Sequence, residues 1–409
     1  MTPGFQLRIP RWYVPVVIVA LFLGANALVV KMAPTNTLTG GQNRRLSFQA
    51  SGEVGYLVPL AGVQGPSGAA LAGILRDLPP NRHGTLSVLY IGNSQTMAIM
   101  DMEPGDRIVV AWFASLLNHG DDGPFAVRLA SEANLTMSEL LLKTVVAALD
   151  PSRRPDVEVV GIVLDGLRWV EARGELVKFA ESLGFREQVR RLLENGPPLP
   201  AAARAVEGLL QHVGAGSELG GGATGEPGSR DARSIARVER QLQDRTEKLV
   251  PLFRARRHLL GTFKLKYTAL RNWVVGFTTT TKRPIAPALY ATNLEFIELT
   301  LRFLRRQGIK GVFYLAPIRP VEPNPYVPED IDRFRKELAS LCERYGAVYM
   351  DYSRLIPEAL WTNYPESDRS GIGGQPDFAH FTGRAHQVLA ERLVADLRPM
   401  FHSWLTDKR

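Results

Sequence analysis

The sequence has a single cysteine, Cys342, in 409 residues. An intrachain disulfide and a zinc site built from several cysteines are therefore excluded. Cys342 lies on the apolar side of a predicted helix, where we expect a core residue. Histidine is also scarce, and His83, His119 and His258 have no metal-ligand partners at a recognisable spacing. The sequence indicates no metal and no other cofactor, and it has no nucleic-acid-binding motif.

Long uncharged apolar runs are scarce too, and the run Trp12–Val30 is about long enough to cross a bilayer as a helix. Arg8 and Arg11 precede it and Lys31 follows it. This distribution predicts a single-pass cell-membrane anchor with a cytoplasmic N-terminus and the remaining chain periplasmic or extracellular. A cleaved signal peptide is the alternative, because Ala25-Asn26-Ala27 resembles a cleavage site. The apolar run continues beyond that site, which favours the anchor.

Basic residues are in excess, giving a net charge of +8 and a pI of about 9.6. This balance fits an Arg-rich surface or affinity for anionic lipid or acidic polymer. Within the stretch Ser234–Gly276, which we expect to be mostly helical, a positive cluster lies beside apolar residues. We interpret it as a contact with membrane or a membrane partner, with a solvated helix face as the alternative. The cluster comprises Arg254, Arg256, Arg257, Lys264, Lys266 and Arg271.

Apolar runs alternate with helical periodicity along much of the chain. The nearly continuous runs Leu86–Ile91 and Val157–Leu164 are typical of strands that are covered on both faces. Ile108–Leu117 is ambiguous between strand and helix. Further strands are predicted at Phe125–Leu129, Val312–Ala316 and Ala347–Tyr352. Helices are predicted at Met137–Leu149 after a Thr136 cap, around Leu294–Leu304 ending at Gly308, from Pro328 to Gly346, and from His380 to near Leu397.

This alternation predicts an α/β domain with a mostly parallel sheet. Sites in such sheets lie at the carboxyl ends of strands, and Ser94, Asp165 and Pro317 all follow predicted strands.

Two short motifs carry the candidate chemistry. Gly92-Asn93-Ser94 follows the first strand, where a turn can present a serine nucleophile. Asp377 and His380 lie three residues apart on what we expect to be one short turn before the last helix, with Thr382 as its N-cap. A carboxylate so placed can hold one imidazole nitrogen while the other faces a nucleophile.

On these two motifs the chain resembles the SGNH/GDSL hydrolase superfamily, with Gly92-Asn93-Ser94 in place of Gly-Asp-Ser and Asp377-x-x-His380 as the last block. The resemblance spans roughly Leu86 to Leu397. It implies a flavodoxin-like three-layer sandwich. It also implies a triad in which Ser94 is the nucleophile, His380 the general base and Asp377 the residue that orients it.

The middle blocks depart from the superfamily's pattern. The second block has no glycine at residues 130–134, and the third ends in Leu164-Asp165-Gly166 without the usual asparagine. An ionised Asp cannot donate to an oxyanion. The Ser94 N–H with Asn134 or Arg168 is therefore the candidate oxyanion hole. A helix cap is the alternative role for Asn134, and an ion pair with Asp165 is the alternative for Arg168. Asn93 and Asp165 are candidate substrate-binding residues.

The chain divides into five predicted parts. These are an N-terminus and anchor at residues 1–31, a juxtamembrane region at 32–84, the two halves of the SGNH-like domain at 85–173 and 285–409, and an insertion at 174–284. The insertion is expected to be helical and basic. The Gly-rich stretch Val213–Arg230 within it is expected to be a flexible loop.

The anchor and the run RPVEPNPYVPED resemble membrane-tethered members of the superfamily that work beside a membrane-bound O-acyltransferase. The resemblance implies an extracytoplasmic serine esterase or O-acyltransferase acting on a cell-envelope or secreted polysaccharide. The alternative is a non-catalytic accessory that scaffolds an acyltransferase or an export complex. The intact Ser94, Asp377 and His380 favour the enzyme, and the altered oxyanion blocks favour the accessory.

Overall fold

A computed structural model describes residues 84–97, 105–119, 125–131, 134–219, 267, 270–364 and 372–408. Apart from residues 267 and 270–275, all of these belong to one compact unit. No helix in these ranges is long and apolar enough to span a membrane. The predicted anchor, the juxtamembrane region and most of the predicted basic cluster lie outside the described residues.

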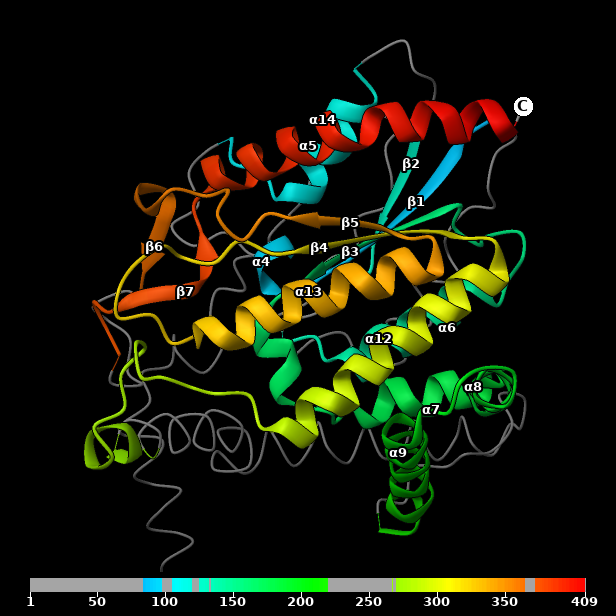
Figure 1. Ribbon diagram of the computed structural model, residues 1–409, viewed down its shortest axis with the longest axis horizontal. Coiled ribbons are helices and arrows are strands. Elements are labelled where there is room, and N and C mark those ends of the chain that lie inside the picture. Colours follow the sequence, from blue (N-terminus) through cyan, green and yellow to red (C-terminus); the bar gives the residue numbers. More distant parts are fainter. Residues whose placement is uncertain are drawn as a thin grey trace, which may run out of the picture. The chain divides into compact units, whose positions relative to one another are not determined.

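The compact unit alternates strands and helices (Figure 1). Its strands are β1 (Leu86–Ile91), β2 (Phe125–Leu129), β3 (Val157–Ile162), β4 (Lys310–Leu315), β5 (Val348–Asp351), β6 (Trp361–Asn363) and β7 (Pro376–Phe381). Its α-helices are α4 (Ser94–Met97), α5 (Val109–Leu117), α6 (Met137–Ala148), α7 (Gly174–Ser182), α8 (Phe185–Glu194), α9 (Pro200–Leu219), α12 (Pro287–Gln307), α13 (Pro328–Tyr345) and α14 (Gly383–Lys408). Two 3₁₀ helices, η1 (Leu164–Arg168) and η2 (Glu358–Leu360), complete the unit.

Five strands form a wholly parallel sheet in the order β2-β1-β3-β4-β5. The predicted α/β class is therefore confirmed, and this order is that of flavodoxin-like doubly wound sheets. β1 and β3 are buried along their whole length, as their continuous apolar runs predict. β6 and β7 form a separate antiparallel pair.

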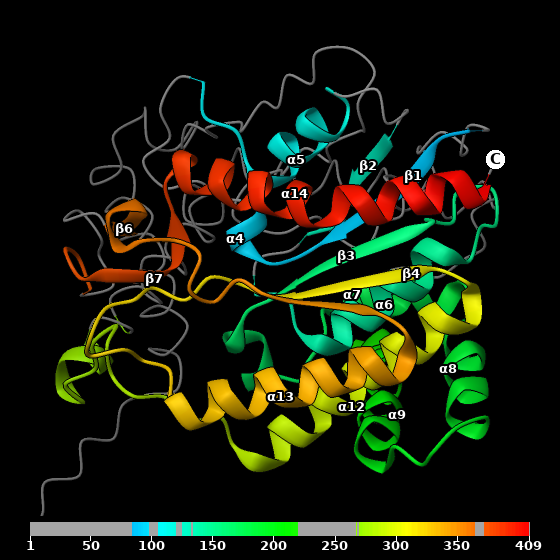
Figure 2. The ribbon, with the colours of Figure 1, turned by 45° about the horizontal axis from the view of Figure 1, so that its top comes forward.

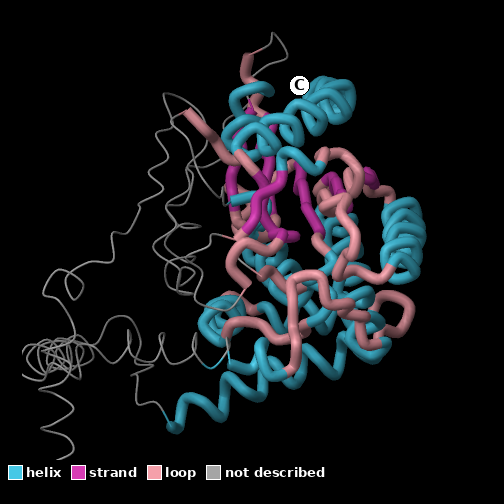
Figure 3. The backbone as a smooth tube through the Cα atoms, turned by 90° about the vertical axis from the view of Figure 1, so that its left-hand side faces the viewer, coloured by secondary structure: helices cyan, strands magenta, loops and turns pink. Residues whose placement is uncertain are grey.

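Helices cover both faces of the sheet (Figures 2 and 3). On one face, α5 and α14 pack against Val88 and Tyr90 of β1 and Val159 of β3. On the other face, α6, α12 and α13 pack against Leu89 and Ile91. The side chains of a strand alternate between its two faces, so each central strand contributes to both cores.

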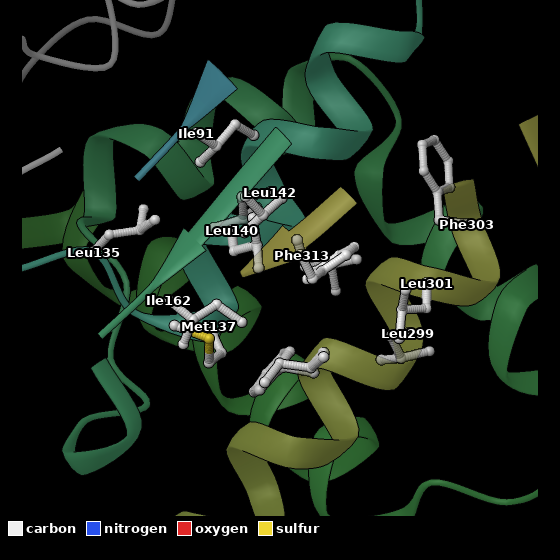
Figure 4. Packing of buried hydrophobic residues seen from close by; sticks show 14 of the residues in the cluster. Ile91, Leu135, Met137, Leu140, Leu142, Ile162, Leu299, Leu301, Phe303 and Phe313 are labelled. Carbon is white, nitrogen blue, oxygen red and sulfur yellow. The ribbon is translucent and has the colours of Figure 1, made fainter. Parts of the chain in front are cut away.

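The second core is the larger one and extends through the first three helices of the predicted insertion. Figure 4 shows Ile91, Ile162 and Phe313 of the sheet packed with apolar residues of α6 and α12. Residues of α7, α8 and α9 are buried in the same cluster, among them Leu176, Phe185 and Ala202. Residues 174–210 therefore share the core of the sheet rather than forming a separate body.

Local signals place several helix ends as predicted. Thr136 is the N-cap of α6 and forms a capping box with Glu139. α12 and α13 begin at prolines and end before Gly308 and Gly346. Both glycines have positive φ, 69° and 70°, a conformation that glycine adopts without steric cost.

The stretch left ambiguous between strand and helix is a helix over Val109–Leu117. Three predicted boundaries were wrong. β3 ends at Ile162, because Leu164 already begins η1. The last helix continues past Leu397 to Lys408 with Pro399 inside it. α9 continues to Leu219, so the predicted loop from Val213 is helical over its first residues. The rest of that stretch lies outside the described residues.

Glu158 is a buried carboxyl group in the middle of β3, with an exposed fraction of 0%. The Thr144 hydroxyl donates to its Oε1 at 2.5 Å. Burial and this hydrogen bond are the two influences on the pKa of Glu158. Burial raises the pKa of Glu158 from 4.5 to about 8. The folded protein therefore holds this proton at neutral pH, whereas the unfolded chain releases it.

This difference in proton binding makes the stability of the folded protein depend on pH. Because the folded pKa lies above the unfolded pKa, the free energy of unfolding should fall as pH rises between about 4.5 and about 8. The expected contribution is about 1.4 kcal/mol per pH unit. Glu158→Gln should lack this dependence, so the variant should gain stability relative to the parent from pH 5 to pH 8. Denaturant unfolding at several pH values measures it, and parallel curves for the two proteins would contradict it.

Candidate active site

The Gly92-Asn93-Ser94 turn connects β1 to α4, which begins at Ser94. The Asn93 side-chain oxygen accepts the Gln95 backbone N–H at 3.0 Å, and the Asn93 carbonyl accepts the Thr96 N–H at 3.0 Å. A Cβ on Gly92 would lie 2.3 Å from Thr96 Cγ2, so the turn requires glycine there. Asn93, a predicted substrate-binding residue, is buried, and its side-chain oxygen is used within the turn.

Two side chains beyond Ser94 fix this turn to neighbouring strand ends. Gln95 is buried, and its Nε2 donates to the carbonyl of Pro317, after β4, at 3.1 Å. The Thr96 hydroxyl lies 2.7 Å from the Ser131 hydroxyl, after β2. The nucleophile turn is therefore attached on both sides to segments that follow parallel strands. Local sequence gave no indication of the Gln95 contact, because its partner is 222 residues away.

Asp377 and His380 interact as their spacing predicts. Asp377 Oδ2 lies 2.8 Å from His380 Nδ1, and Asp377 is fully buried, with an exposed fraction of 0%. Asp377 Oδ1 accepts the backbone N–H groups of Ala379 at 2.7 Å and His380 at 3.2 Å. The His380 side chain is partly exposed, at 21%. This carboxylate holds the imidazole through Nδ1, and Nε2 is the ring nitrogen that such a pair leaves for proton transfer.

These two residues lie in a strand, β7, rather than in a simple turn before the helix. Trp361 of β6 pairs with Phe381, and Asn363 pairs with Pro376, so a longer stretch of β7 faces a shorter stretch of β6. The excess residues form an irregularity that contains Asp377 and His380. Such bulges redirect side chains beside sites. Thr382 directly precedes α14 and its carbonyl accepts the His386 N–H, so it occupies the predicted N-cap position, while its hydroxyl donates to the Leu360 carbonyl.

A buried arginine, Arg319, forms hydrogen bonds to both β6 and β7. Its Nη1 donates to the carbonyls of Thr362 at 2.5 Å and Asp377 at 3.3 Å. Its exposed fraction is 6%, and burial lowers its pKa while the charges of Glu358 and Asp377 oppose that shift. Arg319 belongs to the run RPVEPNPYVPED. The sequence drew attention to that run, but it gave no role for this residue.

The helix that begins at Ser94 contacts β7, the strand that holds Asp377 and His380. The structure thus brings the two predicted motifs to one edge of the fold. Within the described part of the chain, no hydrogen bond joins the Ser94 hydroxyl to His380 Nε2. Catalytic hydrogen bonds are often long before substrate binds.

The candidate oxyanion residues lie after the two strands that flank β1. Asn134 follows β2, is exposed and has a φ of 54°, and the N-cap of α6 is Thr136 instead. Arg168 Nε lies 2.9 Å from Asp165 Oδ1, as its alternative role predicts. The Tyr326 hydroxyl donates to Asp165 Oδ2 at 2.9 Å.

Two other histidines make contacts within the fold. His386 is fully buried, and its Nδ1 accepts the Val109 N–H at 3.1 Å. His119 Nδ1 lies 2.6 Å from the Ser115 carbonyl at the end of α5. Among the described residues there is no group of three or more His, Cys, Asp or Glu side chains suited to a metal ion. Cys342 is buried, which raises its pKa to about 12.

Comparisons with known proteins give little further information. No protein-family model and no curated protein matches the chain. Among solved structures, the chain is similar to a "putative acylhydrolase" from Bacteroides fragilis NCTC 9343, with a TM-score of 0.33 and 10% identity over 81% of this chain and 95% of the other. A second crystal structure gives a TM-score of 0.34 and 13% identity over 78% and 99%. At such TM-scores neither likeness bears on the function of this chain.

Arg319 allows a direct test of how β6 and β7 are held. Arg319→Met retains an apolar stem but leaves two buried carbonyls without their donor. The free energy of unfolding should fall by about 1–3 kcal/mol. Arg319→Lys should lower the free energy of unfolding by less, because an ammonium group can still donate to one carbonyl. Denaturant unfolding measures both, and Arg392→Met, on the exposed side of α14, is the matched control. Equal decreases in the free energy of unfolding for Arg319→Met and Arg392→Met would contradict the claim that Arg319 stabilises the β6–β7 pair.

Proposed function

We propose that this protein is a serine esterase or O-acyltransferase of the SGNH/GDSL type, with Ser94, His380 and Asp377 as its triad. One observation carries the proposal. A fully buried Asp377 holds His380 Nδ1 at 2.8 Å, on a strand that contacts the helix beginning at Ser94. The α/β fold and the position of Ser94 after β1 support it, because sites in such folds lie at the carboxyl ends of strands.

The proposed reaction has two halves. Ser94 Oγ attacks the ester carbonyl carbon while its proton passes to His380 Nε2. That proton then goes to the departing alcohol oxygen as the ester C–O bond breaks, leaving an acyl-Ser94 ester. In the second half, His380 takes a proton from water or a sugar hydroxyl, which attacks the acyl carbon. The proton returns to Ser94 Oγ as it leaves. Water gives hydrolysis, and a sugar hydroxyl gives transfer.

The tetrahedral intermediate needs hydrogen-bond donors for its oxyanion. The backbone N–H of Ser94, at the start of α4, is the proposed first donor. Asn134 is a better candidate than Arg168 for the second. The side chain of Asn134 is exposed, whereas Arg168 already faces Asp165. An amide can donate without carrying charge into the site. Asp165 remains a proposed contact for the alcohol part of the substrate.

The proposed setting is the outer side of a cell membrane, with an acylated cell-envelope or secreted polysaccharide as substrate. The arginines before the apolar run Trp12–Val30 support this setting. A membrane-bound O-acyltransferase is the proposed partner, on the resemblance in the RPVEPNPYVPED run.

A non-catalytic accessory is the second candidate function. Two observations favour it: the Ser94 hydroxyl is not bonded to His380 among the described residues, and an Asp165–Arg168 pair stands where the superfamily has an amide donor. Such a protein would keep the fold and the Asp377–His380 pair without forming an acyl-enzyme.

Labelling with a serine-reactive fluorophosphonate distinguishes the two candidates. The full chain should be labelled, and Ser94→Ala or His380→Ala should each abolish labelling, because the members of a triad act as a unit. Asp377→Asn should slow labelling strongly, by up to about 10⁴-fold, because it disturbs the imidazole tautomer. Mass spectrometry should locate the adduct on Ser94.

The variant Ser182→Ala is the matched serine control, since Ser182 is exposed on α7 and its hydroxyl donates only to the Phe179 carbonyl. Unlabelled parent protein that is folded by circular dichroism would support the accessory function. Labelling that survives in Ser94→Ala would also reject the proposed triad.

The membrane topology is tested separately. A reporter that is active only outside the cytoplasm, fused after Arg409, should be active in cells, because the arginines flanking the apolar run retain the N-terminus inside. Moving Arg8 and Arg11 to the other side of the run should reduce that activity. Activity of a cytoplasm-only reporter at the same position would contradict the proposed setting.

A further inference from the structure

Two arginines share one carboxylate at the edge of the sheet where the proposed triad lies. Arg168 Nε is 2.9 Å from Asp165 Oδ1, and Arg283 Nη1 is 3.9 Å from the same oxygen. The other carboxylate oxygen accepts the Tyr326 hydroxyl at 2.9 Å. The guanidinium of Arg168 also lies over the Tyr326 ring, 5.8 Å from its centroid.

This cluster carries more positive than negative charge. Burial lowers the pKa of Arg168, the charge of Arg283 lowers it further, and the charge of Asp165 opposes the shift. The N–H groups of the two arginines are also not all hydrogen-bonded. Arg168 Nε is engaged by Asp165 Oδ1, whereas the Nε of Arg283 is buried and makes no hydrogen bond to a described residue. A second anion placed between the two guanidinium groups would relieve their repulsion and could accept the Arg283 N–H.

The segment that holds Arg283 contacts the residue before β7 and the loop after β4. The Arg283 N–H donates to the Pro325 carbonyl at 2.9 Å. Earlier in the same segment, the Thr279 N–H donates to Gln375 Oε1 at 2.9 Å, and Gln375 lies two residues before Asp377. Arg283 is therefore on a segment that passes between the start of β7 and the loop after β4.

The other arginine lies next to the nucleophile strand. β1 and β3 are neighbours in register, with Ile91 opposite Val160. Adjacent strands are about 4.8 Å apart, so the η1 turn after β3 and the Ser94 turn after β1 leave the sheet side by side. Trp169 follows Arg168 and is 61% exposed, which offers an apolar surface at the same rim.

We propose that Arg168 and Arg283 form an anion-binding subsite beside Ser94 and His380, and that the substrate is an acidic glycan whose sugar carboxylate pairs with them. This inference rests on the proposed function and names its substrate class. Arginine suits the role because its planar fork binds carboxylates in two parallel hydrogen bonds and remains charged at all working pH values. The exposed indole of Trp169 would lie against the apolar face of a sugar ring.

Binding to the full-length Ser94→Ala protein tests the subsite without turnover. Trigalacturonate and its fully methyl-esterified form are the probes, because they share one sugar backbone and differ in charge. By isothermal titration calorimetry the acid should bind at least about tenfold more tightly than the ester, the range expected for hydrogen bonds to a charged group. Added salt should reduce the difference, because the subsite is partly exposed.

Arg283→Gln, made in the same protein, should abolish most of that preference, and Arg283→Lys should keep part of it. Arg190→Gln is the matched control, since Arg190 is an exposed, ion-paired arginine on α8. It should leave the preference unchanged. Equal affinity for the two probes, or a preference that survives Arg283→Gln, would overturn the subsite.

The fluorophosphonate result separates this inference from the proposed function. Ser94 labelling without a preference for the acid would retain the esterase and reject the acidic-glycan subsite. A preference for the acid without Ser94 labelling would retain the subsite and reject the esterase. In that case the protein would bind acidic glycan without modifying it.

Discussion

The parallel sheet is buried on both faces, and this constraint determines where chemistry can occur. β1 and β3 have no exposed residue, so an unpaired polar side chain along them would carry the full cost of burial. Glu158 illustrates this cost, since burial raises its pKa to about 8 and leaves it uncharged. Charged groups with functional roles are therefore placed at the carboxyl edge, where the strands end and water has access. Asp165 and His380 both lie there, partly exposed.

The loop after β4 holds this edge together. The carbonyl of Pro317 in this loop accepts a hydrogen bond from the Gln95 side chain, beside Ser94. Arg319 binds carbonyls of β6 and β7, including that of Asp377. Tyr326, near the end of the loop, donates to Asp165 after β3. One loop thus contacts the segments that hold Ser94, Asp377 and Asp165.

The structure also shows what Asp165 does at the edge of the sheet. Where an amide would donate to an oxyanion, Asp165 instead neutralises part of the charge of Arg168 and Arg283. A negative residue at this position is costly for an oxyanion but well suited to holding two guanidinium groups close together. Asp165 is thus unsuited to an oxyanion hole but suited to the anion-binding subsite proposed above.

The sequence alone predicted the α/β class, the five parallel strands, the capped helices and the Asp377–His380 contact. All of these depend on short-range patterns: apolar runs of strand length, Thr136 with Glu139, glycines after helices, and a three-residue spacing. Only the tertiary structure decided that Val109–Leu117 is a helix and that residues 174–210 join the main core. It also decided that Gln95 contacts Pro317, Arg319 contacts Asp377, and Arg283 lies near Asp165. Each of those side chains meets a partner far away in the chain. These partners are distant in sequence and come together only when the strands and loops pack, so no short stretch of sequence predicts them.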